Sequence, residues 1–230
     1  MLRAKSGVAS ITAELVEFTK QERQCRPHMA KGNFMDNVLS EAIENDLFNE
    51  LRWLLCAATE WDAHDRLIGE PPQIPQIQEP CSHLKVYTMD SSFLHARSLY
   101  EFFTATERTV LRNKKNGLRR LTWYDYSRNP TVRQTSTKYD QFRQPLHGRL
   151  MHLDQNRSGY NEVKKEVVNF AADILDLWNG FSTHPDLSLY ASLLDKFRDQ
   201  AIGEATGAAE RYKKYGFESP FSLGMNSPRR

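Results

Sequence analysis

The hydrophobic residues of this chain recur at intervals of three and four positions, which is the spacing of one face of an α-helix. Alternation with a period of two, the pattern of a half-buried strand, is nearly absent. We therefore predict an all-α fold, a bundle of five to seven helices. The segments with the helical pattern are 7–24, 34–68, 89–113, 139–153, 161–178 and 187–202, with a short further helix near 208–215.

Breaks in this pattern divide the predicted helices. Clustered prolines predict a Pro-rich linker over 71–88. Residues 113–137 carry many cations without a sustained apolar stripe, and we expect one long basic loop there. Glycine, serine and proline accumulate after residue 203, which predicts a loosely ordered C-terminal tail over 203–230. Residues 1–202 are expected to form a single helical domain.

Charge is unevenly distributed along the chain, although the formal net charge is only +2. Residues 97–157 hold 13 basic and 5 acidic side chains, a net of +8, whereas residues 1–96 have a net of −5. Such a basic block indicates either an anionic partner, such as RNA, or a solvated surface whose counter-charges lie elsewhere in the fold. The acidic N-terminal block could pair with the basic block and would then compete with an external anion for it.

The composition limits the class of protein. Hydrophobic residues make up 40% and charged residues 26%, as in soluble globular chains. No run of 18 apolar residues is present, so we expect no spanning helix and no membrane partner. Glu14 and Glu17 interrupt the N-terminus before an apolar signal segment is formed. The three cysteines are far apart and form no CxxC pair, which indicates a cytoplasmic location.

The most informative stretch is residues 143–157, where two histidines and three arginines lie on a predicted amphipathic helix. Histidine titrates near neutrality and can move a proton, while arginine can hold a phosphate with two parallel hydrogen bonds. Together they suit metal-independent cleavage of RNA, with histidine acting on the ribose hydroxyl and arginine stabilising the phosphate. The alternative is that these groups only pack at the surface. The candidate catalytic residues are His152, Arg149, Arg157, His147, Arg143 and, from an earlier helix, His95.

That earlier helix contains a second group of polar residues. His95 and Arg97 lie about 200° apart on a helix, so they do not face one small ligand together. Arg97 and Glu101 are four residues apart and are expected to pair. His95 is either a buried structural histidine or a group that faces the His152 helix across the bundle.

The predicted basic loop mixes cations with aromatic rings. Cations follow phosphates while rings stack on bases, so the mixture suits single-stranded nucleic acid. The alternative is that the rings anchor a long loop to the bundle. The candidate nucleic-acid-binding residues are Lys114, Lys115, Arg119, Arg120, Trp123, Tyr126 and Arg128.

No motif in the sequence predicts a metal site or a bound cofactor. An HExxH pair, an Asp-rich loop and a Gly-rich phosphate loop are all absent. Asp62, His64 and Asp65 place two carboxylates near an imidazole, but we expect the two carboxylates to form a solvated helix face.

Residues 94–103, Leu-His-Ala-Arg-Ser-Leu-Tyr-Glu-Phe-Phe, resemble the "LHARxLxxFF" helix of a family of uncharacterised bacterial helical proteins. A second signature of that family, "INKxLxHLTxxR", is similar to residues 146–157, where His152, Leu153 and Arg157 match it. This resemblance implies a helical fold and assigns no activity. The positions that depart from the second signature include His147, Gly148 and Asp154.

The chain resembles HEPN domains more distantly. These helical bundles are often dimeric and occur in toxins and antiviral defence. Many are metal-independent ribonucleases in which four to six residues lie between an arginine and the histidine that follows it. Arg143 and His147 leave three residues between them, and Arg149 and His152 leave two, so both pairs depart from that rule. The resemblance implies an RNA-binding protein or a metal-independent ribonuclease. The alternative function is a non-enzymatic helical protein–protein interaction module that forms a homodimer.

Overall fold

The structure is a computed structural model, which describes residues 31–67, 80–116, 121–149 and 160–221. The chain divides into two compact units, residues 1–39 and 40–230, where a single domain over 1–202 was expected. The described part of the first unit is the beginning of α2 (Lys31–Ala42). The predicted helix over 7–24 lies outside the described residues.

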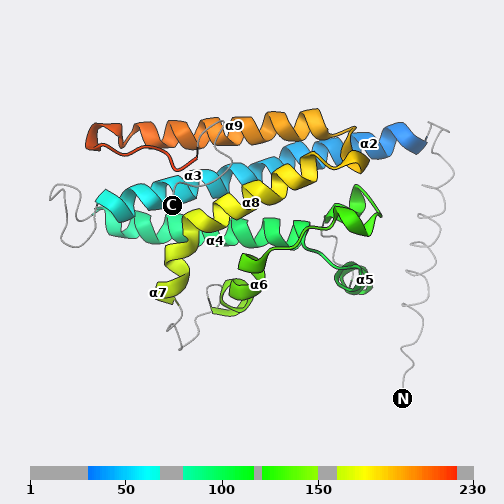
Figure 1. The fold of residues 1–230 in the computed structure, drawn as a ribbon, viewed down its shortest axis with the longest axis horizontal. Helices are drawn as coiled ribbons and strands as arrows, with labels where there is room; N and C mark the ends of the chain where they lie inside the picture. The colour runs from blue at the N-terminus through cyan, green and yellow to red at the C-terminus, as the bar shows by residue number, and fades with distance from the viewer. Residues whose placement is uncertain (1–30, 68–79, 117–120, 150–159, 222–230) are drawn as a thin grey trace, which may run out of the picture. The chain divides into compact units, whose positions relative to one another are not determined.

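Four long helices of the second unit pack side by side. α3 contacts both α4 and α9, and α8 packs against all three of them (Figure 1). The described residues contain no β-strand, so the prediction of an all-α bundle is confirmed. None of the described helices combines the length and the apolar character needed to cross a bilayer. The bounds are Phe48–Leu67 for α3, Pro80–Phe103 for α4, Val167–Ser182 for α8 and Ala191–Glu210 for α9.

α4 carries much of the core. Leu99, Tyr100 and Phe103 have no exposed surface, as expected for a helix that is apolar around most of its circumference. The helix begins at Pro80, because proline suits the first turn of a helix, where its missing N–H has no intrahelical partner to lose. The predicted Pro-rich linker over 71–88 is therefore wrong from Pro80 onward, and its earlier residues lie outside the described ranges.

Within the predicted basic loop over 113–137, the described residues form the end of a helix with the turn that follows it, up to residue 116, and an anchored connection from residue 121. α5 (Glu107–Lys115) occupies its beginning. Trp123 is fully buried and donates its indole Nε1–H to the carbonyl of Ala105 at 2.9 Å. Val132 is buried as well. These two side chains hold the connection against the bundle, which is why it is not an open loop.

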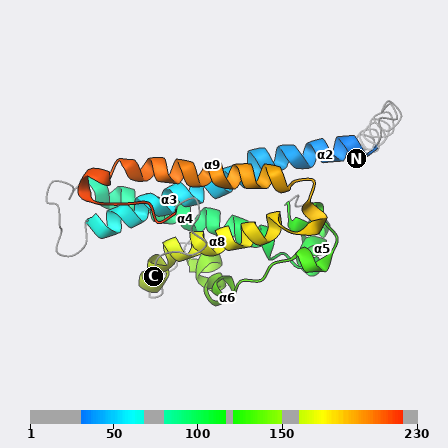
Figure 2. The same ribbon diagram turned by 45° about the horizontal axis from the view of Figure 1, so that its top comes forward.

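Two short helices lead from this connection back to the bundle. α6 (Thr137–Gln144) starts at a cap in which the Ser136 hydroxyl accepts the backbone N–H of Tyr139 at 2.9 Å. α7 (Tyr160–Val163) precedes α8. Figures 1 and 2 show α5 and α6 on the side of α4 that faces away from α9. Single turns of 3-10 helix lie at Trp123–Asp125, Pro130–Val132, Lys164–Glu166, Pro185–Leu187 and Lys213–Tyr215.

The C-terminal segment is more ordered than predicted. α9 continues to Glu210, and Gly216, at a φ of 80°, turns the chain back toward the bundle. Phe217 and Phe221 are then buried. The predicted loose tail over 203–230 is therefore wrong as far as residue 221, because two aromatic side chains fix the segment.

Candidate functional site

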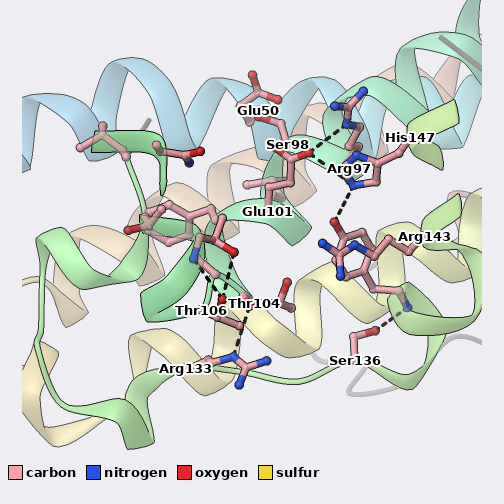
Figure 3. Close-up of a pocket in the computed structure, with 18 of the residues that line it drawn as sticks. Glu50, Arg97, Ser98, Glu101, Thr104, Thr106, Arg133, Ser136, Arg143 and His147 are labelled. Atoms are coloured by element: carbon pink, nitrogen blue, oxygen red, sulfur yellow. Dashed lines mark hydrogen bonds and ion pairs between the residues drawn. The ribbon is translucent and has the colours of Figure 1, made fainter. Parts of the chain in front are cut away.

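An open cleft of about 1260 Å³ is lined by α4, α5, α6 and the connection that joins α5 to α6. Residues at and just before the start of α3 and His147, which follows α6, complete the lining. Figure 3 shows Arg97 and Glu101, from α4, beside His147, with Arg143 nearby and Arg133 farther along the cleft. Hydroxyl groups fill much of the remaining wall. The lining residues that carry a hydroxyl include Ser98, Thr104, Thr106, Thr109, Thr122, Thr135, Ser136 and Tyr139.

Arginine is the most frequent charged residue among the described residues of the cleft. Arg97 is paired with Glu101, and Arg133 donates its Nε–H to the carbonyl of Thr104 at 3.2 Å. The guanidinium group can hold a phosphate with two parallel hydrogen bonds. The lining arginines are Arg97, Arg108, Arg112, Arg133 and Arg143, and the lining carboxylates are Asp46, Glu50, Glu101 and Asp140.

One end of the cleft holds five polar side chains in contact, and we call these the His147 cluster: Arg97, Glu101, Tyr139, Arg143 and His147. The imidazole Nε2 of His147 lies 2.8 Å from the hydroxyl of Tyr139 and 3.4 Å from Oε1 of Glu101. Arg97 donates its Nε–H to the same Glu101 oxygen at 3.0 Å. The guanidinium of Arg143 lies 5.8 Å from the centre of the Tyr139 ring.

The backbone of the α6 segment brings these residues together. Tyr139 and His147 are eight residues apart, and the α-helix changes to a π-helical turn over Pro145–Arg149 between them. Proline has no N–H for the α-helical hydrogen bond, so the regular ladder stops at Pro145. His147 lies in the π-helical turn with its side chain 31% exposed, which leaves it accessible from the cleft.

A buried network supports the cluster from behind. The ring of Tyr139 stacks on the ring of Tyr100, with centroids 4.7 Å apart and planes 13° apart. Tyr100 donates its hydroxyl hydrogen to Asp173 of α8 at 2.6 Å, and Ser136 donates to the same carboxylate oxygen. Because Ser136 also caps α6, this carboxylate fixes both the helix start and the ring against which Tyr139 rests.

The environment of Tyr139 keeps its hydroxyl protonated. Burial, followed by the negative charge of Glu101, raises the pKa of Tyr139 to about 12. At neutral pH the phenol can therefore donate to a neutral His147, while a protonated His147 can donate to the carboxylate of Glu101. The imidazole thus has a suitable hydrogen-bond partner in either charge state, which is what a proton-transfer group requires.

The predicted catalytic residues fall into three groups. Arg143 and His147 lie together in the His147 cluster. His95 lies outside the lining of the cleft and accepts or donates a hydrogen bond at 2.9 Å with Glu50, beside the ring of Trp53. This contact agrees with the expectation of a structural, hydrogen-bonded histidine, while the alternative, that His95 faces the His152 helix, involves residues outside the described ranges. The residues whose side chains lie outside the described part of the chain are Arg149, His152 and Arg157.

The predicted nucleic-acid-binding residues also separate. Stacking of Trp123 on a base is excluded, because its ring is fully buried. Tyr126 packs edge to face against Phe102 and Phe181, so its ring serves the bundle as well. Lys115 and Arg128 are exposed and free to meet solvent. The candidates whose side chains are not described are Lys114, Arg119 and Arg120.

Several residues of the cleft were not predicted from the sequence. Arg108 and Arg112 are four residues apart on α5, a spacing that could have shown them to share a face. Arg133 lies in the basic block but was not chosen. The sequence did not indicate that Tyr139 and Glu101 contact His147, because these contacts depend on the π-helical turn and on the packing of α6 against α4.

A second Tyr–His pair lies inside the bundle, away from the cleft. Nε2 of His64 is 2.8 Å from the hydroxyl of Tyr212, and the His64 residue is only 2% exposed. Asp62 is 6% exposed and bonds to Arg66 at 2.8 Å. The expected solvated face is therefore wrong for Asp62, which lies on the core side of α3.

No protein-family model, curated protein or solved structure matches the chain. In the part of the chain that the structure describes, no group of three or more His, Cys, Asp or Glu side chains is arranged to hold a metal ion.

Proposed function

We propose that this protein binds RNA in the arginine-lined cleft and cleaves it without a metal ion. The observation that carries the proposal is the meeting of His147, Glu101 and Arg97 at one end of the cleft, with contacts of 3.4 Å and 3.0 Å. This places a proton acceptor, a carboxylate and a guanidinium group within one substrate's reach.

In the proposed reaction, His147 takes the proton from a ribose 2′-hydroxyl. The 2′-oxygen then attacks the adjacent phosphorus, and the bond from phosphorus to the 5′-oxygen of the next nucleotide breaks. The leaving 5′-oxygen takes a proton from water, and His147 returns its proton to solvent. The products are a 2′,3′-cyclic phosphate and a 5′-hydroxyl, so no oxidant, reductant or metal is needed.

The other members of the His147 cluster have distinct roles in this proposal. Glu101 stabilises the imidazolium that forms when His147 accepts a proton. Arg97 and Arg143 face the negative charge that develops on the phosphate. Tyr139 is a positioning residue, because its hydroxyl holds the imidazole at 2.8 Å while its own ring is fixed by Tyr100.

The test is cleavage of a labelled RNA by pure protein in the presence of EDTA. We expect products that end in a 2′,3′-cyclic phosphate, loss of cleavage in His147→Gln, and no cleavage of DNA, which lacks the 2′-hydroxyl. His184→Gln is the matched control, because His184 lies in the connection between α8 and α9 and does not line the cleft. Absence of cleavage, or equal cleavage by His147→Gln and wild type, would exclude this function.

A non-enzymatic interaction module that forms a homodimer is the second candidate function. The observation that favours it is an apolar strip on α4, where Leu84, Tyr87 and Leu94 lie on one side of the helix and are 47%, 68% and 44% exposed. In this proposal the strip packs on the same strip of a second copy. Light scattering should then give a dimer mass that Tyr87→Glu reduces to a monomer, whereas a wild-type monomer at all concentrations would reject it.

A further inference from the structure

α5 presents a row of cations that the chemistry proposed for His147 does not require. Arg108, Arg112 and Lys115 are spaced at i, i+4 and i+7, so they lie on one face of the helix. All three side chains are exposed. Arg108 and Arg112 also line the cleft, whereas Lys115 extends the row beyond the residues that line it. We call these three residues the α5 stripe.

The α5 stripe is not neutralised by the described part of the chain. The ion pairs formed there involve none of its three side chains. Cations on other elements do pair, as Lys138 does with Glu166 at 2.6 Å and Arg198 with Asp195 at 3.0 Å. Like charges three and four residues apart destabilise a helix, so an anion bound along the stripe would relieve that repulsion.

The geometry of the α5 stripe suits a chain of phosphates better than a single one. With a rise of about 1.5 Å per residue, its ends are about 10 Å apart along the helix axis. Leu111, 59% exposed, lies next to the stripe on the same helix and offers an apolar surface to an unpaired base. A backbone of repeated negative charges with accessible base faces is a property of single-stranded nucleic acid.

We propose that the α5 stripe binds the phosphate backbone of a single-stranded RNA whose neighbouring segment enters the cleft. This proposal rests on the proposed function for its choice of RNA, and it adds the path that the strand takes along α5. Recognition is electrostatic and independent of sequence, because the stripe offers charges and not a pattern of donors and acceptors for bases.

The test is the salt dependence of binding, measured by fluorescence anisotropy with a labelled 2′-O-methyl oligouridine 20-mer that cannot be cleaved. For single strands the logarithm of affinity falls with the logarithm of salt at a slope of about −0.7 per neutralised phosphate. The triple variant Arg108→Gln, Arg112→Gln, Lys115→Gln should therefore have a slope shallower by about 2. Its affinity at 0.1 M salt should fall roughly 10- to 100-fold. Glutamine is a good helix former, so α5 is retained, and circular dichroism verifies this.

The matched control removes three charges from α9 and the turn that follows it. Lys196, Lys213 and Lys214 are exposed and do not line the cleft. The triple variant with glutamine at these positions should keep a slope within about 0.5 of wild type. Equal slopes for the two triple variants, or no binding by wild type at 50 mM salt, would overturn the proposal. Wild-type affinity for polyglutamate in place of RNA would identify an acidic polypeptide as the ligand and would overturn it as well.

A dinucleotide substrate separates this proposal from the proposed function. A dinucleotide carries too few phosphates to span both sites, so the α5 triple variant should lose a much smaller fraction of its dinucleotide cleavage than of its affinity for the 20-mer, although Arg108 and Arg112 line the cleft. His147→Gln should lose that cleavage. If His147→Gln cleaves normally while the slope still changes in the α5 variant, the ribonuclease proposal fails and RNA binding along α5 stands.

Discussion

Two of the described histidines each share a 2.8 Å hydrogen bond with a tyrosine hydroxyl, His147 with Tyr139 and His64 with Tyr212. Their surroundings differ. His147 has a side chain 31% exposed and a carboxylate, Glu101, 3.4 Å from the same nitrogen. His64 is buried, and its Nδ1 has no hydrogen-bond partner. Burial lowers the pKa of His64, so that histidine is kept neutral.

The Tyr–His contact therefore does not by itself indicate chemistry. Tyr212, the partner of His64, packs against a small apolar cluster of Ala63, Ala209 and Phe217, and placing a charge beside such a cluster is costly. At His147 the side chain is 31% exposed and lines the open cleft, with the carboxylate of Glu101 at 3.4 Å. The contact at His64 therefore belongs to the packed interior, whereas the contact at His147 lies where the proposed function needs a proton-transfer group.

The largest expected effect is on cleavage. His147→Gln should reduce the rate of RNA cleavage by about 100-fold or more, since a positioned acid–base group contributes about 10²–10⁴-fold. His64→Gln should leave the rate of the folded protein within about twofold, because His64 does not line the cleft. Both rates are measured at 20 °C on protein whose folding has been verified. Equal losses in the two variants would remove the distinction between the sites.

The second-largest expected effect is on stability, where the substitution of His64 should cost more than the substitution of His147. His64→Ala deletes a buried, hydrogen-bonded ring and should lower the free energy of unfolding by about 2–4 kcal/mol. His147→Ala deletes a half-exposed ring and should lower it by less than about 1 kcal/mol. Urea denaturation gives both values. A larger loss at His147 than at His64 would show that the cleft histidine is a packing residue.

A smaller effect concerns the pH dependence of stability. Because burial lowers the pKa of His64 below the ordinary 6.5, the unfolded chain binds a proton at a higher pH than the folded one. The contribution of His64 is thus fully present above pH 6.5 and is lost as the pH falls toward the lowered folded value. Glu60, Lys85 and Arg211 are the charged groups that act on this imidazole.

Thermal melts between pH 7.5 and 5.5 should therefore show a decline for wild type that is reduced in His64→Gln. Asp62 acts in the opposite sense, because burial raises the pKa of its carboxyl and favours the folded state as the pH falls. His64→Gln leaves Asp62 in place, so the difference between the two profiles isolates the histidine. Parallel profiles would contradict the buried, neutral state assigned to His64.

The smallest effect is expected for the carboxylate that accompanies His147. Glu101→Gln removes a negative charge from an arginine-lined cleft, and the affinity for the 2′-O-methyl oligouridine should rise about two- to fivefold. Glu162→Gln is the control, since Glu162 is exposed and does not line the cleft. An affinity that falls in Glu101→Gln, or rises equally in both variants, would show that Glu101 does not face the bound anion.

The sequence predicted the helical architecture well where packing follows periodicity. The apolar residues of α4 predicted that this helix lies at the centre of the bundle, and Leu99 and Phe103 are indeed fully buried there. Pro80 misled the prediction because proline both ends linkers and begins helices. Asp62 and His64 also misled it, because a polar segment gives no sign that α9 and the C-terminal aromatic residues cover it.

The candidate site was predictable only in part. Arg143 and His147 were predicted to adjoin because they are four residues apart, and both line the cleft. Their partner Tyr139 depends on the π-helical turn that follows Pro145, and Glu101 depends on the packing of α6 against α4. Trp123 was instead chosen wrongly as a base-stacking residue. It lies among cations in the sequence, but its ring is buried and its indole N–H is bonded to the carbonyl of Ala105.

The most direct test of the account observes both histidines in one experiment. Two-dimensional NMR of protein labelled in its histidine rings, with signals assigned from His147→Gln and His64→Gln, is recorded during titration with the 2′-O-methyl oligouridine. The account predicts that the ring signals of His147 shift in proportion to the bound fraction, while those of His64 stay in place. An unmoved His147 signal at saturation, or equal shifts at both histidines, would contradict it.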